Sequence, residues 1–377
     1  MIKVLLSSNT SWYLYNYRIS FAKFLQVHGY TPVFVAPEDQ YTEKIIEEGF
    51  RYIQIDLERK STNPFTEWNT IQQFESIYRT EQPDLIHHHT AKPVIYGSFA
   101  SKKFNIPTVN SITGLGYAFS SKTIKARALK PVILAMYKHA INNHKRCSVI
   151  HQNLANMEFF LNHGISTREY SYYIPGSGAE KYKFYPAKIS STAFPPIVIF
   201  PTRMLWDKGV GVFANAAKLL KERHKVCRMV LVGSSDEGNP NAIPHATITK
   251  WVNEGILEWW GWRSDMRIVY NECDLLVYPS FSEGLPRTLV EAALCETPII
   301  ATDIPGCRDI IQHRENGLLI PPRDSLALAD AIEELLSEKE LRIRFGRSAR
   351  ESALKHFEHN VIAEKTLAVY ERLLSQK

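Results

Sequence analysis

Residues 279–294 read PSFSEGLPRTLVEAAL, and within them a strand-like apolar pattern gives way to an amphipathic helical pattern. The helical pattern begins near Pro286, a residue that suits the first turn of a helix. The backbone amides of Arg287, Thr288 and Leu289 would then point outward, where unpaired N–H groups and the helix dipole favour a phosphate. The stretch therefore predicts a diphosphate-binding turn between a strand and a helix.

Two carboxylates frame this predicted anion site. Glu283 lies in the turn, beside Gly284, and Glu291 follows eight residues later. A carboxylate accepts hydrogen bonds from two neighbouring hydroxyls, so Glu291 suits a ribose diol and Glu283 a transferred sugar. The alternative is an exposed helix residue at Glu291 and a partner of the helix dipole at Glu283.

Strand-like runs separated by helical stretches recur along the whole chain, which predicts parallel sheets covered by helices. At about 150 residues per domain, 377 residues indicate two domains. We expect an α/β protein of two doubly wound, Rossmann-like domains facing across a cleft, because ligands bind beyond the carboxyl ends of such strands. The first series of runs is 3–8, 32–36, 52–56, 85–89, 108–112, 148–152 and 172–175; the second is 197–202, 229–233, 256–261, 275–280, 298–302 and 318–320.

The segment 175–196, PGSGAEKYKFYPAKISSTAFPP, has the Pro, Gly and Ser content of a linker. The predicted domains are therefore 1–185, which would bind an acceptor, and 186–377, which would bind a donor. Residues 357–374 have near-helical apolar spacing, and this final helix is expected to pack back on the first domain.

Two cations follow the strand at 197–201, in the sequence TRMLWDKG. Arg203 and Lys208 would lie in the loop that leaves the sheet, and together they could neutralise a departing diphosphate. The alternative is a solvated surface pair, with Asp207 as a local partner of Lys208.

Arg203 and Lys208 in an R-x4-K-G setting, followed by Glu283-Gly284 and Glu291, resemble the donor site of retaining glycosyltransferase family 4. That family has the GT-B fold. More narrowly, the chain resembles bacterial transferases that add N-acetylhexosamines, N-acetylgalactosamine among them, to undecaprenyl-diphosphate saccharides. The segments that carry this narrower resemblance are Asn63-Pro64-Phe65, Gly114-Leu115-Gly116, Leu205 to Val210 and Arg263-Ser264-Asp265.

The resemblance implies a UDP-sugar donor, a lipid-linked saccharide acceptor and no cofactor. It assigns the diphosphate to Arg203 and Lys208, the sugar to Glu283, the ribose to Glu291 and the uracil to the loop near Trp260. By this assignment Arg203, Lys208 and Glu283 are catalytic, while the donor-binding set is Glu291, Gly284, Arg287, Thr288, Leu289 and Trp260.

The first domain departs from the family pattern in two places. Many members have His where this chain has Thr113, and Ser7-Ser8-Asn9-Thr10 replaces the usual Gly-rich first loop. Asn16 and Arg18 are expected to compensate by reaching the acceptor phosphate, and glycines near Thr113 let backbone approach a ligand. The acceptor residues so predicted are Asn9, Asn16, Arg18, Lys92, Thr113, Gly114 and Gly116.

Other patterns exclude some classes of protein. Neighbouring side chains of a strand point to opposite faces, so His87, His88 and His89 cannot all bind one metal ion. Asp-x-Asp is absent, so activity is expected without a metal, and the absence of Gly-x-Gly-x-x-Gly disfavours a dinucleotide dehydrogenase. Five cysteines without C-x-x-C spacing indicate reduced thiols and a cytoplasmic protein.

Positive charge is concentrated in the first half. Residues 1–190 hold 22 Lys and Arg against 14 Asp and Glu, and no acid occurs between Asp84 and Glu158. An apolar stripe from Leu129 to Ile141 lies inside this acid-free segment and is either buried against the sheet or in contact with a membrane. No run approaches the ~20 apolar residues of a spanning helix. We therefore expect peripheral attachment to the anionic inner face of the membrane, and no nucleic-acid partner.

The predicted reaction is retaining transfer of a hexose or N-acetylhexosamine from a UDP-sugar to a lipid-diphosphate-linked saccharide, in cell-surface glycan, O-antigen or protein-glycan assembly. A UDP-sugar epimerase of the same fold, a transferase using another nucleotide sugar and a non-catalytic binding protein are the alternatives. The donor sugar, the acceptor and the linkage are left open by the sequence.

Overall fold

The computed structural model describes residues 1–59, 61, 63–114, 119, 124–142, 144, 146–187 and 194–376; for 124–126 only the backbone is described. Internal contacts divide the chain into two units, Met1–Ser177 with His359–Lys377, and Gly178–Glu358. The sequence predicted domains of 1–185 and 186–377, with the last helix packed on the first domain. The two units are described separately below.

The first unit is built on a parallel sheet with strand order β3-β2-β1-β4-β5-β6-β7 among the described residues. The strands are β1 (Ile2–Ser7), β2 (Tyr30–Ala36), β3 (Arg51–Gln54), β4 (Leu85–His89), β5 (Thr108–Ile112), β6 (Cys147–His151) and β7 (Ser171–Tyr173). The helices are α1 (Ser11–Val27), α2 (Thr42–Glu47), α3 (Pro64–Glu81), α4 (Ser98–Lys103), α6 (Ile124–Ile141), α7 (Leu154–Asn162) and α15 (His359–Ser375), with short turns η1 (Pro93–Gly97) and η2 (Arg168–Tyr170).

Local sequence explains where the helices of this unit begin. The Thr10 hydroxyl accepts a hydrogen bond from the Tyr13 amide and caps α1, and Asn63 caps α3 in the same way through the Phe65 amide. Pro64 then occupies the first turn of α3, where its missing N–H group leaves no helical hydrogen bond unmade.

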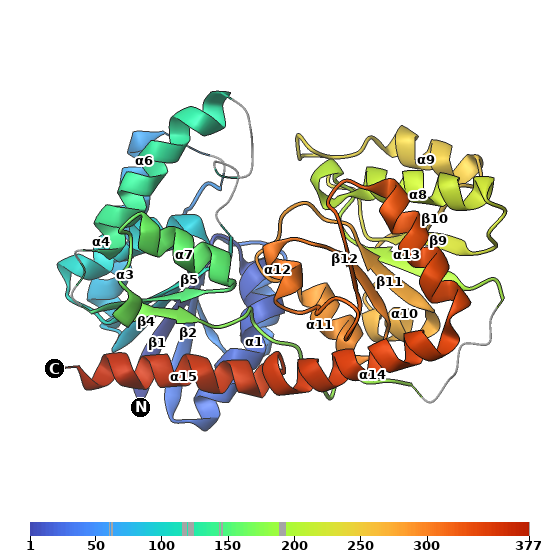
Figure 1. The fold of residues 1–377 in the computed structure, drawn as a ribbon. Helices are drawn as coiled ribbons and strands as arrows, with labels where there is room; N and C mark the ends of the chain where they lie inside the picture. Colours follow the sequence, from blue (N-terminus) through green and yellow to red (C-terminus); the bar gives the residue numbers. More distant parts are fainter. Residues whose placement is uncertain are drawn as a thin grey trace. The chain divides into compact units, whose positions relative to one another are not determined.

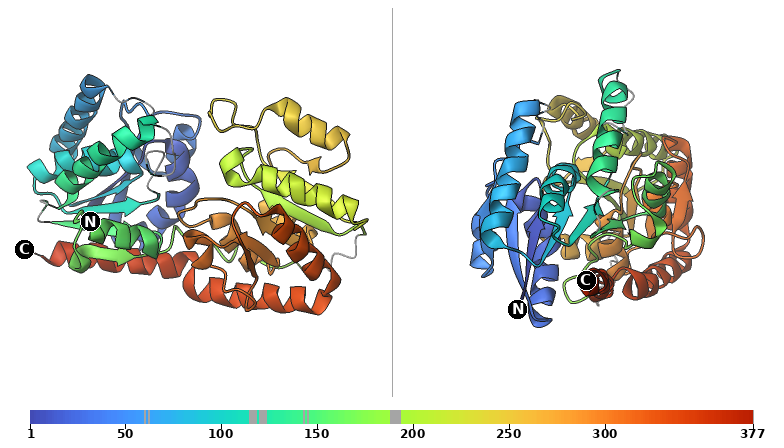
Figure 2. Two further views of the ribbon diagram at one scale, coloured as in Figure 1. Left: turned by 45° about the horizontal axis from the view of Figure 1, so that its top comes forward. Right: turned by 90° about the vertical axis from the view of Figure 1, so that its left-hand side faces the viewer.

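The two faces of this sheet bury separate apolar clusters. Side chains of α1, α2 and α15 pack on one face, where Leu14, Ile45 and Tyr370 lie in one cluster with Leu6 of β1. Side chains of α3, α4, α6 and α7 pack on the other face. Figures 1 and 2 show this layering, and α15 contacts α1 although the two helices are more than 300 residues apart.

The second unit has a parallel sheet with strand order β10-β9-β8-β11-β12-β13 among the described residues. Its strands are β8 (Ile197–Pro201), β9 (Arg228–Val232), β10 (Glu258–Trp259), β11 (Leu275–Tyr278), β12 (Ile299–Thr302) and β13 (Leu318–Ile320). Its helices are α8 (Val210–Glu222), α9 (His245–Asn253), α10 (Met266–Glu272), α11 (Arg287–Leu294), α12 (Pro305–Arg308), α13 (Ser325–Ser337) and α14 (Lys339–His356), with a 3-10 turn η3 (Trp206–Lys208).

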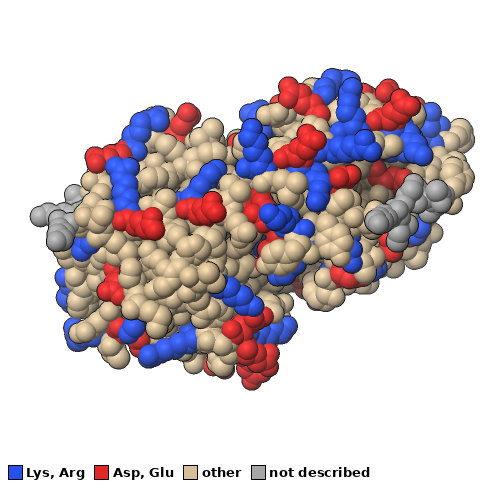
Figure 3. Space-filling model, turned by 90° about the horizontal axis from the view of Figure 1, so that it is seen from below, with Lys and Arg blue, Asp and Glu red and all other residues tan. Residues whose placement is uncertain are grey.

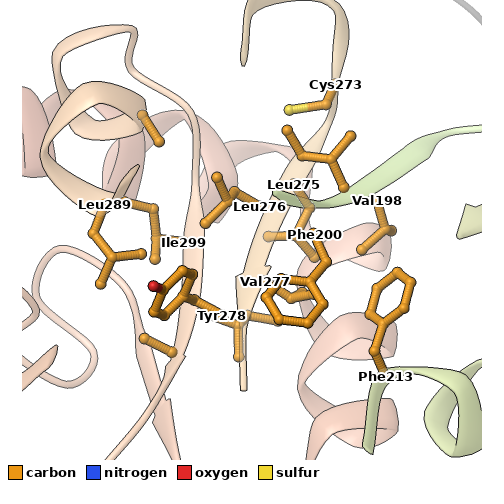
Figure 4. Close-up of a cluster of buried hydrophobic side chains, with 14 of the residues drawn as sticks. Val198, Phe200, Phe213, Cys273, Leu275, Leu276, Val277, Tyr278, Leu289 and Ile299 are labelled. Atoms are coloured by element: carbon orange, nitrogen blue, oxygen red, sulfur yellow. The ribbon is translucent and has the colours of Figure 1, made fainter. Parts of the chain in front are cut away.

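Helices cover both faces of the second sheet, so its strands bury apolar side chains on both faces. Figure 4 shows Val198 and Phe200 of β8 with Leu275 and Val277 of β11, all fully buried. Leu289 of α11 belongs to the same cluster, so the helix that follows β11 is fixed to the core. The predicted architecture, two doubly wound parallel sheets, is confirmed.

Candidate active site

The order of strands in the second sheet reverses between β8 and β11. In open parallel sheets, ligands bind beyond the carboxyl ends of the strands at such a switch point. The strands end here at Pro201 and Tyr278, and the segments that leave them carry Lys208 and Glu283. The switch point therefore lies beside two of the residues that the sequence predicted for a donor site.

Glu283 is the best-connected polar residue at this switch point. Its Oε1 accepts hydrogen bonds from Lys208 Nζ at 2.7 Å, Ser280 Oγ at 2.6 Å and Tyr278 Oη at 2.9 Å. The side chains of Lys208 and Glu283 are only 19% and 12% exposed, so this ion pair is partly shielded from water. These three donors fix one oxygen of the Glu283 carboxylate.

The backbone ties the loop of Lys208 to the loop of Glu283. The Phe281 amide donates to the Asp207 carbonyl at 3.1 Å. Gly209 has a φ of +83°, and a Cβ at that position would lie 2.0 Å from the Pro279 carbonyl oxygen. Only glycine permits this approach, so the glycine of the R-x4-K-G segment holds the two loops together.

Gly284 is positioned by a similar close contact. A Cβ on Gly306, in α12, would lie 2.4 Å from the Gly284 carbonyl oxygen. The turn between β11 and α11 thus packs closely against α12, and the glycine at position 306 leaves room for this contact. This support was not predicted from the sequence, because nothing in the 279–294 segment identifies α12 as its neighbour.

Arg203 has a different environment from Lys208. Its side chain is 57% exposed, and Nη1 lies 2.9 Å from Asp236 Oδ2, in the loop after β9. An exposed ion pair of this kind contributes only about 0–1 kcal/mol, so Arg203 can exchange Asp236 for a ligand anion at little cost.

Glu291 is held on α11 by two partners. Arg287 Nε lies 2.8 Å from Oε1, and the Tyr270 hydroxyl donates to Oε2 at 3.0 Å. Burial raises the pKa of the Glu291 carboxyl, against the opposing effect of Arg287 and Tyr270. Tyr270 lies on α10, 21 residues away, and no local pattern could have identified it.

The N-terminus of α11 differs in detail from the prediction. The helix begins at Arg287, with Pro286 at the N-cap position instead of the first turn. The Leu289 amide donates to the Pro286 carbonyl at 3.0 Å, so the prediction that this amide points outward is wrong. This hydrogen bond tightens the first turn of α11, and the Leu289 side chain is fully buried in the core. Thr288, which lies between Arg287 and Leu289, is half-buried.

Trp260 lies just after the edge strand β10. Its indole N–H donates to Glu258 Oε2 at 3.0 Å, and its backbone amide donates to the Leu231 carbonyl. The guanidinium carbons of Arg228 and Arg263 lie 5.8 and 5.9 Å from its ring centroid. These contacts fix the orientation of the Trp260 ring.

The residues predicted to contact an acceptor belong to the first unit. The Asn9 amide donates to Thr90 Oγ1 at 3.1 Å, and Asn16 Nδ2 donates to the Trp12 carbonyl at 2.8 Å. Arg18 is only 4% exposed. Thr113 and Gly114 follow β5 and are half-buried, whereas Gly116 lies outside the described residues.

Lys92 is bound within its own unit. Its Nζ donates to Glu67 Oε1 at 2.6 Å and to the carbonyls of Glu58 and Ser61. This arrangement gives Lys92 the structural role of fastening the loop before α3 to the turn after β4.

The three histidines of β4 alternate between the two faces of the sheet, as expected. His87 Nδ1 lies 2.6 Å from Tyr370 Oη on one side, and His88 Nδ1 lies 2.6 Å from Ser7 Oγ on the other. Burial lowers the pKa of His88 to about 3 and lowers the pKa of His87 and of His89 as well. The described residues contain no group of three or more His, Cys, Asp or Glu placed to hold a metal ion.

Both halves of the chain resemble known proteins. Residues 3–152 match the family described as "Glycosyl transferase 4-like", and residues 183–352 match "Glycosyl transferases group 1". The chain is 28% identical to the N,N'-diacetylbacillosaminyl-diphospho-undecaprenol alpha-1,3-N-acetylgalactosaminyltransferase of Campylobacter jejuni, over 96% of each chain. It is 25% identical to the Escherichia coli UDP-Gal:alpha-D-GlcNAc-diphosphoundecaprenol alpha-1,3-galactosyltransferase, over 71% of this chain and 70% of that protein.

Solved structures match the fold over the full length. HepE of Anabaena, in complex with UDP and glucose, superposes with a TM-score of 0.83 at 18% identity, covering 99% of this chain and 100% of HepE. Sucrose-phosphate synthase from Thermosynechococcus elongatus gives 0.82 at 20% identity, covering 100% of both chains.

The chain is therefore a glycosyltransferase with the GT-B fold. It belongs to the glycosyltransferases that join a 4-like first half to a group 1 second half, and its role is in the assembly of a glycan.

Proposed function

We propose that this glycosyltransferase moves a hexose or N-acetylhexosamine, with retention, from a UDP-sugar to a saccharide linked to a lipid diphosphate. The observation that carries the proposal is the ion pair of Lys208 and Glu283 at the switch point of the second sheet. The names of the Campylobacter and E. coli relatives support the acceptor class, since both name a diphospho-undecaprenol saccharide.

The roles follow from charge and position. Lys208 and Arg203 are the cations at the site, so they neutralise the diphosphate as it leaves the sugar. Glu283 presents Oε2 to the hydroxyls of the donor sugar, because Oε1 already accepts hydrogen bonds. Glu291 accepts the ribose hydroxyls, and a charged acceptor makes such hydrogen bonds roughly twice as strong as neutral ones.

The remaining donor contacts come from the turn and its neighbours. The backbone of Gly284, Arg287 and Thr288 approaches the diphosphate at the start of α11, and Leu289 anchors that helix through the core. The backbone near Trp260 meets the uracil. With two cations for the leaving group, the reaction is proposed to need no metal ion.

The test is a transfer assay with purified protein. UDP-sugars are supplied singly with undecaprenyl-diphosphate saccharides, and the anomeric configuration of the product is read by NMR. We expect one donor to give an α-linked product from an α-linked donor, with full turnover in excess EDTA. Inversion would remove the retaining assignment, and activity lost to EDTA and restored by Mg²⁺ would remove the metal-free assignment. Incubation without acceptor must leave the donor unchanged, since an epimerase would convert it.

A membrane-facing role for α6 is part of the proposal. One face of the second half of this helix is buried, with Tyr137, Ala140 and Ile141 in the core, whereas Lys138 and His139 are exposed. In its first half Val132 is 54% exposed, beside exposed Arg127 and Lys130. Exposed apolar and cationic side chains together favour the surface of an anionic bilayer.

The position of α6 suits the charge distribution. On the face drawn in Figure 3, the Lys and Arg side chains of the described residues are interspersed with Asp and Glu, so this face offers no extended positive surface. The acid-free segment between Asp84 and Glu158 includes α6, so the basic residues of this helix have no acidic neighbours in the sequence. Among the described residues, no helix combines the length and apolar content needed to cross a lipid bilayer.

A further inference from the structure

Each glutamate of the proposed donor site receives a hydrogen bond from a buried tyrosine. Tyr278 Oη donates to Glu283 Oε1 at 2.9 Å, and Tyr270 Oη donates to Glu291 Oε2 at 3.0 Å. Tyr278 is 6% exposed and ends β11, and Tyr270 is 2% exposed and lies on α10. Neither tyrosine belongs to the donor-binding set that the sequence predicted, so the site has two polar groups more than expected.

Both tyrosines are held firmly in the second unit. Thr302 Oγ1 donates to the Tyr278 carbonyl at 3.2 Å, and the Tyr278 ring lies edge-on to the ring of Phe200, with centroids 6.0 Å apart (Figure 4). Thr297 Oγ1 donates to the Tyr270 carbonyl at 2.9 Å. Burial raises the pKa of the Tyr270 hydroxyl, so this hydroxyl keeps its proton and remains a donor. Each hydroxyl therefore directs its hydrogen bond to one fixed place.

The tyrosines differ from the cations that also hold these glutamates. Lys208 Nζ lies 2.7 Å from Glu283 Oε1, and Arg287 Nε lies 2.8 Å from Glu291 Oε1. The two cations are 19% and 22% exposed. A diphosphate is itself an anion, so a donor bound at this site competes with each carboxylate for its cation. A neutral, buried hydroxyl is much less open to such competition, so the tyrosines remain to orient the carboxylates when the donor is bound.

We infer that each tyrosine is a positioning residue for one half of the donor. Tyr278 keeps Glu283 oriented for the transferred sugar. Tyr270 keeps Glu291 oriented for the ribose. The inference rests on the proposed function for the roles of the two glutamates, and it adds that separate hydrogen-bonded pairs hold the sugar and the nucleotide.

The first test compares UDP with UDP-sugars in calorimetric titrations of the full chain. The probes are UDP, UDP-galactose, UDP-glucose and UDP-N-acetylgalactosamine, and the measured quantity is the affinity for each UDP-sugar divided by the affinity for UDP. Tyr278→Phe should lower this ratio by about fivefold for the sugar that the parent binds best, because a hydrogen bond to a charged group is lost. The affinity of this variant for UDP should equal that of the parent.

Tyr270→Phe should show the opposite division. It should lower the affinities for UDP and for the UDP-sugar by the same factor, about fivefold, so that their ratio stays parental. Loss of UDP affinity in Tyr278→Phe, or a changed ratio in Tyr270→Phe, would overturn the inference. Parental affinities in both variants would overturn it as well.

The matched control is Tyr137→Phe. Tyr137 is also buried, at 1% exposure, but it lies on α6 of the first unit. Its variant should keep the parental affinities for UDP and for the UDP-sugar. Equal losses in the control and in the two test variants would show a general effect of tyrosine removal and would reject the positioning roles.

Ser280→Ala gives a second variant for the sugar half of the site. Ser280 Oγ donates to the same oxygen of Glu283 at 2.6 Å. The variant should lower the ratio of UDP-sugar to UDP affinity in the same direction as Tyr278→Phe. If Tyr278→Phe fails to fold, an unchanged ratio in Ser280→Ala still rejects the idea that hydroxyl donors orient Glu283.

A double-mutant cycle tests whether Tyr270 acts through Glu291. In the Glu291→Gln background, Tyr270→Phe should change the affinity for UDP by less than about twofold, because the hydroxyl no longer acts on a carboxylate. A loss as large as in the parental background would show that Tyr270 affects UDP by another route, and would reject its positioning role.

Transfer assays separate this inference from the proposed function. If the variants divide as expected and no sugar reaches an undecaprenyl-diphosphate saccharide, the proposed function fails while the positioning roles stand. If transfer occurs and Tyr270→Phe lowers kcat but leaves the KM for the UDP-sugar unchanged, its role in nucleotide binding is wrong. A parent that binds GDP or ADP in place of UDP removes UDP from the proposed function, and the same ratios are then measured with GDP-sugars or ADP-sugars.

Discussion

At the scale of single residues, few groups hold the Glu283 carboxylate of the proposed donor site. Lys208 is the only cation among the described residues within ion-pair distance of Glu283, while the Tyr278 and Ser280 hydroxyls also donate to the same oxygen. Removing Lys208 would therefore leave the Glu283 carboxylate hydrogen-bonded and the loop intact, but would remove a positive charge from the proposed diphosphate site.

We expect Lys208→Ala to lower kcat by about 100-fold or more, the usual loss when one electrostatic donor is removed from a reacting site. Its melting temperature should stay within about 4 °C of the parent, because roughly 1 kcal/mol shifts a domain of this size by that much. Lys221→Ala, on the exposed side of α8, is the control and should change neither value. Unchanged turnover in Lys208→Ala at parental stability would reject its role in catalysis.

Glu291 gives a prediction about pH. Because burial raises its pKa, the folded state holds the carboxyl proton more tightly than the unfolded chain does. Stability from this group is therefore fully present below the unfolded pKa of 4.5 and is lost as pH rises through the folded pKa. Glu291→Gln should thus gain stability relative to the parent as pH rises above 4.5, in thermal unfolding measured from pH 4 to 7.

The same variant separates stability from binding. Glu291→Gln should weaken UDP binding by about tenfold, since the ribose loses a charged hydrogen-bond acceptor. A variant that loses stability at pH 7 and keeps its affinity for UDP would show that Glu291 serves α11 and not the ribose.

At the scale of helices and strands, α6 carries the prediction about membranes. Each cation near an anionic leaflet contributes about 1 kcal/mol, and this contribution weakens with salt. Within the first half of α6, Arg127 and Lys130 are cations with described, exposed side chains. Arg127→Glu with Lys130→Glu should therefore reduce binding to anionic vesicles at 0.15 M salt by about tenfold or more, in a co-sedimentation assay.

The control for α6 is an equal change of charge elsewhere. Lys221→Glu with Lys250→Glu alters two exposed lysines of the second unit. This pair should bind vesicles as the parent does, and neutral vesicles should bind every protein poorly. Activity on a water-soluble acceptor should survive in all of them. Equal vesicle binding by both double variants would reject α6 as the attachment surface.

Much of the fold could be predicted because its elements are local. β-branched and apolar runs mark the strands, and Asn63-Pro64 marks the start of α3 by chemistry that needs no distant partner. The position of Glu283 between β11 and α11 followed in the same way. Its partners Tyr278 and Ser280 are within five residues, yet only the turn geometry shows that they meet on one oxygen.

Contacts between distant segments could not be predicted. Asp236 opposes Arg203 across two loops, and Tyr270 reaches Glu291 from another helix. The sequence predicted that Arg18 reaches an acceptor phosphate, but it could not show that α1 buries this side chain beside Tyr13. Helical spacing tells which residues share a face, but burial depends on what packs against that face.

At the scale of the whole molecule, the two units differ in their buried histidines. Burial lowers the pKa of His144 and of His151 to about 4, and it lowers the pKa of the three histidines of β4 as well. All five belong to the first unit. Among the described residues of the second unit, no histidine is buried.

These histidines predict that the first unit is the acid-sensitive one. The pKa of each buried histidine is lower in the folded state than in the unfolded chain. The neutral ring therefore contributes stability that is fully present above the unfolded pKa of 6.5 and is lost as pH falls below it. The loss is about 1.4 kcal/mol per histidine for each pH unit, until the folded pKa near 4 is reached. Several histidines together can match the roughly 5–15 kcal/mol that stabilises a domain.

The measurement is limited proteolysis at pH 7.5 and pH 5.0 with peptides identified by mass spectrometry. At pH 5.0 new cleavages should appear first between residues 1 and 177, before any in the second unit. His151→Leu removes a ring whose nitrogens have no partner among the described residues, so it should lower the pH at which the first unit becomes cleavable. His163→Leu changes an exposed histidine and should not. Simultaneous cleavage of both units at every pH would show that the buried histidines do not control acid unfolding.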